Sequence, residues 1–202
     1  MTRSLITAAV ALAMPAAALA EAHEEPSVAP PTCDYGAPHP QAPEALAQFD
    51  FLIGDYAITA HAWREGPNGW AWTPPRPGPA PRWNGRYILG GMAIEDEWFD
   101  PDPGLDPASP RGVNIRMWDA EDGEWDMTWI HTSGRQVQDL RAKVIDGTLT
   151  MWQVYPDRPG FKATFERLDP DSWHRITYAP DDAGEWQPTF KLVATRIPCP
   201  ED

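Results

Sequence analysis

Short apolar runs that alternate with polar residues, separated by turn residues, dominate this chain from Phe49 to Ile197. Alternation with a period of two is typical of half-buried β-strands. Two of the separators, Asp122-Gly123 and Asp146-Gly147, are strong hairpin signals. Ten strands are predicted: Asp55–Trp63, Arg82–Leu89, Met92–Phe99, Val113–Trp118, Trp125–His131, Gln136–Ile145, Thr148–Tyr155, Phe161–Leu168, Trp173–Tyr178 and Thr189–Ile197.

Consecutive hairpins with little helix between them favour an all-β fold, an antiparallel up-and-down barrel. Glu44–Gln48 is expected to form one helical turn, because Pro43 suits the first position of a helix. The apolar cluster Phe49–Ile53 follows and is expected to plug one end of the barrel. Two long connections, Glu65–Pro81 and Asp100–Arg111, are expected at the open mouth.

The N-terminus has the pattern of a secretory signal peptide. Arg3 gives a positive start, Leu5–Leu19 is an Ala-rich apolar stretch, and Ala18-Leu19-Ala20 is a small-residue cleavage site. The stretch is too short and too weakly apolar for a lasting membrane anchor. We therefore predict cleavage after Ala20 and a mature protein in the periplasm or outside the cell. The alternative is an N-terminal helix of the fold.

The remaining sequence divides into a spacer and one domain. Residues 21–43 are rich in Pro, Ala and Glu and are predicted to be a flexible spacer, and residues 44–202 are predicted to form the barrel. The chain has two cysteines, Cys33 and Cys199. In an oxidising compartment we expect them to form a disulfide that ties the two ends of the domain together.

The acidic composition limits the classes of partner. The chain carries 16 Lys and Arg against 30 Asp and Glu, a net charge of −14 at pH 7. Such a surface repels nucleic acid and anionic lipid, so we expect neither a nucleic-acid partner nor membrane insertion. The chain also has 11 Trp. A buried indole needs a partner for its N–H, which favours a barrel with a mixed polar and aromatic lining.

The segment from Phe49 to Tyr56 reads Phe-Asp-Phe-Leu-Ile-Gly-Asp-Tyr. It resembles the Phe-Asp-Phe-(Leu/Trp)-x-Gly-x-Trp opening of the DUF1579-type lipocalin-like proteins, with Tyr56 at the Trp position. The resemblance spans residues 49–197 and implies a small calycin barrel, but it implies little about activity. Further matches are Gly90/Gly91 with Glu95–Trp98, Trp118-Asp119 with Gly123-x-Trp125, Trp129 with Ser133-Gly134, and Thr195-Arg196.

Strong catalytic motifs are absent from the sequence, so candidate site residues come from alternation alone. Side chains two apart share a face in a barrel, so polar residues in phase can line its cavity. Trp125, Met127, Trp129 and His131 fall on one face of a strand. His131, at the strand end, is a candidate acid or base near neutral pH. The alternative is a histidine at a surface turn.

Two neighbouring strands carry polar residues in phase. Glu95 and Glu97 share a face of one predicted strand, and Asn114 and Arg116 share a face of the next. We predict that Asn114 and Arg116 point into the barrel, where Arg116 pairs with Glu97. Because a buried Arg–Glu pair is commonly structural, the alternative is that this pair has no part in binding.

Arginines within strands suggest the charge of a ligand. Arg suits bidentate capture of carboxylate or phosphate groups. Arginines inside the barrel of an acidic protein therefore predict an anionic ligand, held between apolar walls of Trp83, Trp129 and Trp152. The alternative is that these arginines lie on exposed strand faces. The four are Arg116, Arg141, Arg175 and Arg196.

The preferred prediction is a non-catalytic barrel that binds a small hydrophobic or amphipathic molecule, including an anionic one. An alternative is a small isomerase, lyase or hydrolase that uses His131 with Glu97 or Glu95 as acid and base. A further alternative is an interaction module that docks through Trp70 and Trp72. We expect neither a cofactor nor a metal site. The predicted ligand-binding residues are Trp83, Glu97, Asn114, Arg116, Trp129, His131, Arg141, Trp152 and Arg175.

Overall fold

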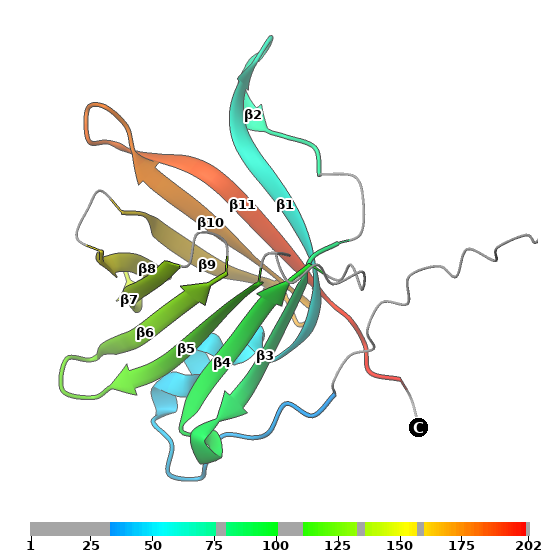
Figure 1. Cartoon of the computed structure of the whole chain (residues 1–202), viewed down its shortest axis with the longest axis vertical. Coiled ribbons are helices and arrows are strands. Elements are labelled where there is room, and N and C mark those ends of the chain that lie inside the picture. The colour runs from blue at the N-terminus through cyan, green and yellow to red at the C-terminus, as the bar shows by residue number, and fades with distance from the viewer. Residues whose placement is uncertain (1–32, 76–79, 101–110, 133–135, 157–159, 201–202) are drawn as a thin grey trace, which may run out of the picture.

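The computed structural model describes residues 33–75, 80–100, 111–132, 136–156 and 160–200. Within these residues the chain forms an antiparallel β-barrel with two short 3-10 helices (Figure 1). The helices are η1 (Glu44–Leu52) and η2 (Leu89–Gly91). The strands are β1 (Gly54–Gly66), β2 (Gly69–Trp72), β3 (Arg82–Ile88), β4 (Ala93–Phe99), β5 (Arg111–Asp119), β6 (Glu124–His131), β7 (Gln136–Ile145), β8 (Thr148–Tyr155), β9 (Lys162–Asp169), β10 (Ser172–Pro180) and β11 (Trp186–Arg196).

The strands follow one another around the barrel in the order β11-β10-β9-β8-β7-β6-β5-β4-β3-β1. The first and last strands of this order then pair, with Tyr56 opposite Arg196 and Ala62 opposite Phe190, which closes a ten-stranded barrel. The ten predicted strands and the up-and-down topology are therefore confirmed.

The sequence prediction missed β2, which pairs with β1 alone and extends it into a hairpin beyond the rim (Figure 1). We predicted this stretch as part of the loop Glu65–Pro81. Its four residues, Gly69–Trp72, are too few to show an alternating pattern. They are also mostly exposed, so no buried face marks them as a strand.

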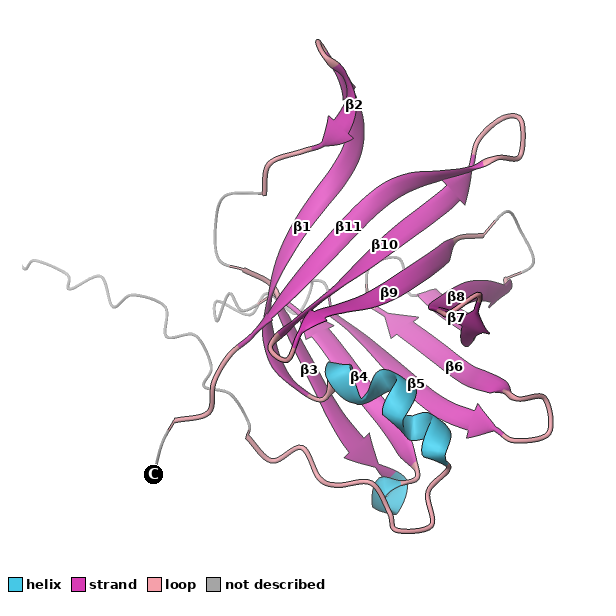
Figure 2. Ribbon diagram, turned by 180° about the vertical axis from the view of Figure 1, so that it is seen from behind, coloured by secondary structure: helices cyan, strands magenta, loops and turns pink. Residues whose placement is uncertain are grey.

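The helix η1 closes one end of the barrel, as Figure 2 shows. Its side chains Leu46, Phe49 and Leu52 are buried in the core. The Phe49 ring meets Trp125 edge-on, at 4.9 Å between ring centroids, and Phe165 at 5.5 Å. The predicted plug is confirmed. It extends past Gln48 to Leu52 because the apolar cluster that follows continues the helix into the barrel.

The last residue of β11 joins the strand ends at the plug. Arg196 donates hydrogen bonds to the Ile53 carbonyl oxygen (3.0 Å) and to the Tyr56 hydroxyl (2.6 Å). Its guanidinium lies 4.8 Å from the centroid of the Tyr56 ring. The Tyr56 hydroxyl in turn donates to the Phe51 carbonyl oxygen at 2.6 Å. Burial of this hydroxyl raises the pKa of Tyr56 to about 12, although Arg196 opposes the shift.

The N-terminal part of the described chain is fastened to the barrel. Cys33 and Cys199 form the predicted disulfide. The Tyr87 amide donates to the Tyr35 carbonyl oxygen (2.8 Å), and the Tyr35 hydroxyl donates to Asp55 (2.9 Å). The stretch that we predicted as a flexible spacer is thus fixed against the barrel from Cys33 onward. The predicted signal peptide lies outside the described residues.

No helix within the described ranges is long and apolar enough to cross a membrane.

Candidate functional site

The residues that face the barrel interior change in character from the plugged end to the mouth. Strand β6 presents Trp125, then Met127, then Trp129 and finally His131 to the inside. On the neighbouring strand, Arg116 lies opposite Met127 and Asn114 lies opposite Trp129. The interior is therefore aromatic and closed at the plug, polar in its middle, and aromatic again at the mouth.

An ion pair occupies the polar middle of the barrel. Arg116 pairs with Asp96, and the two side chains are 1 % and 0 % exposed. The Arg116 guanidinium also lies 4.9 Å from the centroid of the Phe49 ring in the plug. Burial, together with the charge of Arg175, lowers the pKa of Arg116 well below its usual range.

This arrangement confirms the predicted direction of Asn114 and Arg116 but not the predicted partner of Arg116. Asn114 and Arg116 point inward and are buried, as predicted. The predicted partner of Arg116 was wrong, because Asp96, not Glu97, faces the interior of β4. Glu97 lies on the outer face, where it pairs with Arg111 at 3.5 Å.

Two other predicted binding residues also lie on the outer surface. Arg141 pairs there with Glu124 at 3.3 Å and with Asp126. Trp152 packs against Lys143, whose ammonium lies 5.8 Å from the ring centroid. Both predictions were wrong for the same reason. Leu140 on β7 and Met151 on β8 face the core, so their immediate neighbours in sequence must face outward.

The remaining predicted residues meet at a cavity of about 220 Å³ near the mouth. Trp83, Trp129, His131 and Arg175 line it, from three different strands. Sequence reasoning missed Trp98 in this wall. Trp98 is two residues from Asp96 and shares its face, so identifying the correct partner of Arg116 would have found it. The remaining lining residues are Ile58, Ala60, Pro81, Phe190 and Leu192.

A second hollow, of about 590 Å³, adjoins this cavity. The two share the wall residues Ile58, Ala60, Pro81, Trp98 and Phe190. The second hollow continues along β1 toward the β2 side of the mouth, where His61, Thr73 and Asp100 border it. A ligand in the inner cavity therefore has room to extend outward.

The aromatic wall depends on a glycine. The Trp129 and His131 rings are stacked, with 5.7 Å between centroids and an interplanar angle of 18°. The Trp129 ring lies over Gly112, where a Cβ would come within 2.2 Å of two of its ring carbons. Any larger residue at this position would force Trp129 to move, so Gly112 sets the position of the wall.

Arg175 is the charged group of the inner cavity. It projects inward from β10, opposite Phe165 and Leu192, which are both buried. It makes no ion pair or hydrogen bond with any residue that the structure describes, and its Nε is buried without a partner. Burial lowers the pKa of Arg175 to about 10, which leaves the side chain cationic at neutral pH.

Other polar atoms around the middle of the barrel are also buried without a hydrogen-bond partner in the part of the chain that the structure describes. Trp83 Nε1, Asn114 Oδ1 and Thr177 Oγ1 are buried and have no hydrogen-bond partner among the described residues. Buried polar groups in proteins are nearly always hydrogen-bonded, so each such atom needs an explanation. A ligand or ordered water at the inner end of the cavity would supply the missing partners.

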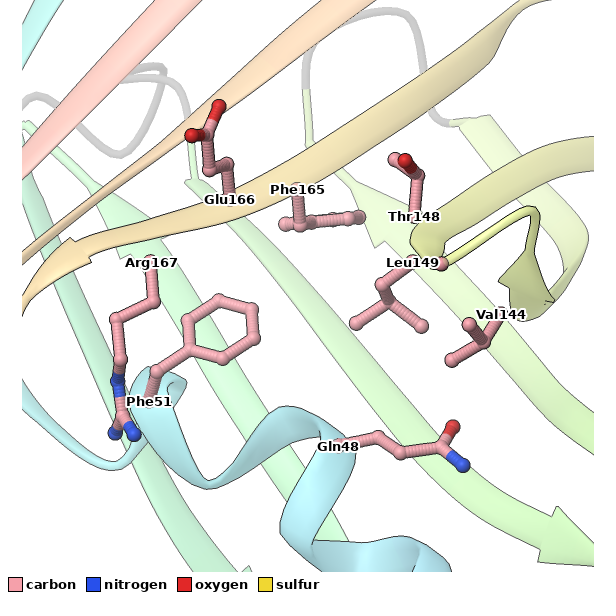
Figure 3. A pocket seen from close by; sticks show the side chains of 9 residues that line it. Gln48, Phe51, Val144, Thr148, Leu149, Phe165, Glu166 and Arg167 are labelled. Carbon is pink, nitrogen blue, oxygen red and sulfur yellow. The ribbon is translucent and has the colours of Figure 1, made fainter.

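A third hollow lies at the plugged end, between η1, the β7–β8 hairpin and β9, and measures about 510 Å³ (Figure 3). Three of its charged and polar side chains, Arg167, Glu166 and Gln48, already have partners. Arg167 pairs with Asp50 at 3.2 Å and lies 6.0 Å from the Phe51 ring centroid. Gln48 Oε1 accepts a hydrogen bond from Trp125 Nε1 at 3.0 Å. These contacts fasten the plug, so this hollow is the weaker candidate for a binding site.

The tryptophans of the predicted docking loop lie on the β1–β2 hairpin. Trp63 contacts Trp72 edge-on, at 5.0 Å between centroids, and stacks on Trp70 at 6.4 Å. Lys191 of β11 lies 5.1 Å from the Trp72 ring centroid. Trp70 is 59 % exposed. These rings support one another and the hairpin, and docking through them stays a prediction.

Comparison with models of protein families and with curated proteins gives no match for this chain. Among the described residues, no group of three or more His, Cys, Asp or Glu is placed to hold a metal ion.

Proposed function

We propose that this protein binds a small amphipathic molecule in the cavity at the mouth of its barrel. The observation that carries the proposal is the construction of that cavity. Its walls are Trp98, Trp129 and Phe190, and its inner end meets the buried polar middle of the barrel at Arg175. Apolar walls with a few convergent polar groups are typical of small-molecule sites.

The proposed acid–base pair of the catalytic alternative does not come together in the inner cavity. His131 lines the cavity, but Glu97 and Glu95 both lie on the outer face of β4. They pair there with Arg111 and Arg86 respectively. An acid and a base must both reach the reacting atoms, so this pair does not serve a substrate inside the barrel.

Export and family membership belong to the same proposal. The Cys33–Cys199 disulfide supports an oxidising compartment, and the pattern of residues 1–20 supports export by a cleaved signal peptide. The closed barrel, its plug and the Arg196–Tyr56 contact support a DUF1579-type, lipocalin-like relationship. We propose a periplasmic or secreted carrier.

The test is native mass spectrometry of the protein purified from its own host, with denatured protein as the mass reference. We expect an adduct that is lost on denaturation. The variant Ala60→Phe places a ring in the shared wall of the two hollows and should abolish the adduct. Thr195→Phe is the matched control, since Thr195 is exposed on the outer face of the adjacent strand.

Loss of the adduct in Ala60→Phe but not in Thr195→Phe would support a ligand in the barrel mouth. An adduct that survives Ala60→Phe would place the ligand elsewhere. If the wild-type protein carries no adduct and binds no member of an amphipathic ligand panel, the proposed function is wrong.

A further inference from the structure

We infer that the ligand is a monocarboxylate whose carboxylate binds Arg175 at the inner end of the cavity, with its apolar body among Trp98, Trp129 and Phe190. This inference rests on the proposed function and names the chemical class of the ligand. The charges of the interior, the donors in the cavity of Arg175 and the placement of acidic groups at the mouth support it.

The interior of the barrel contains more positive charge than its described acidic groups neutralise. Arg116 and Arg175 both project inward, and Asp96 is already paired with Arg116. Placing a charge in a low-dielectric site without a partner is costly, and an anion that binds there offsets the cost. The two guanidinium groups lie close enough for the charge of Arg175 to lower the pKa of Arg116, so they add to one positive region of the interior.

The donors around Arg175 fit a planar anion. A guanidinium presents its N–H groups in a fork that matches the two oxygens of a carboxylate. Trp83 lines the same cavity, and its buried Nε1 has no partner among the described residues. Thr177 lies two residues along β10 and its Oγ1 is likewise buried without one. The Trp83 N–H is therefore an additional donor in the same cavity, and the Thr177 hydroxyl is a further one on the same strand as Arg175.

The distribution of acidic groups orients the ligand. No carboxylate is among the described residues that line the inner cavity. Asp100 borders the outer hollow instead. The negative head group is therefore favoured at the inner end and disfavoured near the mouth, so the apolar body extends outward between the aromatic walls.

The number of cations favours a carboxylate over a phosphate ester. A phosphate carries up to two negative charges and three acceptor oxygens. Arg175 is the only arginine among the described residues that line this cavity, and the nearby Arg116 is already paired with Asp96. A single negative charge matches a single unpaired guanidinium, and a dianion would remain partly uncompensated in the interior.

The test is calorimetric titration of the wild-type protein at pH 7 with three probes that share one chain: decanoate, decanol and decylammonium. We expect decanoate to bind at least about ten-fold more tightly than decanol, since a hydrogen bond to a charged group is typically worth a factor of ten or more. Decylammonium should bind most weakly, because Arg175 repels it.

Variants then assign the head-group preference to one residue. Arg175→Met should weaken decanoate binding roughly ten- to a hundred-fold and leave decanol binding nearly unchanged. Arg175→Lys keeps the charge but loses the fork and should fall between the two. Arg141→Met is the matched control, because Arg141 also lies mid-strand but pairs with Glu124 and Asp126 on the outer surface.

The outcomes separate the two proposals. Equal binding of decanoate and decanol would overturn the assignment of the carboxylate and leave the amphipathic cavity standing. Failure of all three probes to bind would count against both. If Arg175→Met does not fold, the wild-type preference and the Arg175→Lys variant still decide the matter, since a decanoate preference untouched by Arg175→Lys would place the head group elsewhere.

Discussion

Two arginines face the interior of the same barrel, and their surroundings differ. Arg116, in the middle of the barrel next to the plug, pairs with Asp96 and packs on the Phe49 ring. Arg175, at the inner end of the mouth cavity, has no acidic partner among the described residues and lines open space. The guanidinium beside the plug therefore has a partner of opposite charge in a closed core, and the guanidinium at the mouth cavity has none in the part of the chain that the structure describes.

The comparison indicates which end of the barrel is built for stability and which for binding. A protein that holds a buried charge without a partner gives up stability at that position. Such a cost is typical of functional sites, where local structure serves the ligand. Substitutions at the plugged end, and then at groups that belong to neither site, can test this division.

The largest effect is expected for Asp96→Ala. The substitution leaves Arg116 charged and unpaired in the core, which should lower the free energy of unfolding by about 3–5 kcal/mol. Denaturant unfolding followed by Trp fluorescence measures this change. The double variant Asp96→Leu with Arg116→Met removes both charges and should recover most of the loss. A loss below about 1 kcal/mol for Asp96→Ala would contradict a stabilising role for the pair.

The plug and the mouth should respond differently to loss of an aromatic ring. Phe49 is fully buried against Trp125 and Phe165, so Phe49→Ala should cost about 3–5 kcal/mol of unfolding free energy. Phe190 in the mouth wall is only partly buried, and Phe190→Ala should cost roughly half as much or less. Thermal and denaturant unfolding of both variants measure the difference. Equal losses would remove the distinction between the two ends.

Removal of the disulfide is expected to have the next largest effect on stability. Cys33 and Cys199 are 166 residues apart, and closing such a long loop restricts the unfolded chain. The double variant Cys33→Ser with Cys199→Ser should lower the unfolding free energy by about 2–4 kcal/mol. Ligand affinity should not change, because the bridge lies outside the mouth cavity. A variant that folds equally stably would show that the hydrogen bonds of this segment, such as Tyr35 to Asp55 and the Tyr87 amide to Tyr35, hold it without the bridge.

High pH should weaken the contact between the plug and β1. The pKa of Tyr56 is about 12 in the folded protein and 10 in the unfolded chain, so folding favours the protonated hydroxyl. Its contribution is fully present below pH 10 and is lost as the pH rises through 12, by up to about 2–3 kcal/mol. Unfolding measured from pH 8 to pH 12 tests this.

Tyr56→Phe is the control for that experiment. It should remove the part of the alkaline loss that comes from Tyr56. The pKa values of Tyr35 and Tyr87 are also raised by burial, so a remaining pH dependence is expected from them. An alkaline profile identical in wild type and Tyr56→Phe would contradict the assignment.

The sequence predicted the framework better than the site, for a physical reason. Hairpin signals such as Asp122-Gly123 and the two-residue alternation fixed nearly every strand and the plug. Alternation does not say which face of a strand is inside when both faces carry apolar and charged residues. On β4 the outer face carries Glu95 and Glu97, and the inner face carries Asp96 and Trp98. The types of side chain on β4 alone therefore do not show which face is inside the barrel.

The sequence placed some interior residues correctly because apolar residues on the same strand face mark that face as the inside. Trp129 and His131 share a face with Trp125 and Met127, and this run is apolar enough to mark the inside of β6. Arg175 was chosen only because it lies mid-strand, and that argument selected Arg141 equally well. The register of β10 against the buried Leu192 separates the two arginines, and register is a property of the folded barrel.

The smallest effect is expected at Glu97, which alternation alone placed in the cavity. Glu97 lies on the outer face, 43 % exposed, in a pair with Arg111 that is 42 % exposed. Exposed pairs of this kind contribute little, so Glu97→Gln should change the unfolding free energy by less than about 1 kcal/mol. Decanoate affinity should stay within about two-fold, because a carboxylate outside the barrel neither binds nor screens a ligand at Arg175. Denaturant unfolding and calorimetry of this one variant measure both quantities.

A clear gain in decanoate affinity would show that Glu97 repels the ligand at the rim, where it and His131 border a common hollow of about 350 Å³. The boundary between outer surface and binding site would then lie further out than the inner cavity alone indicates.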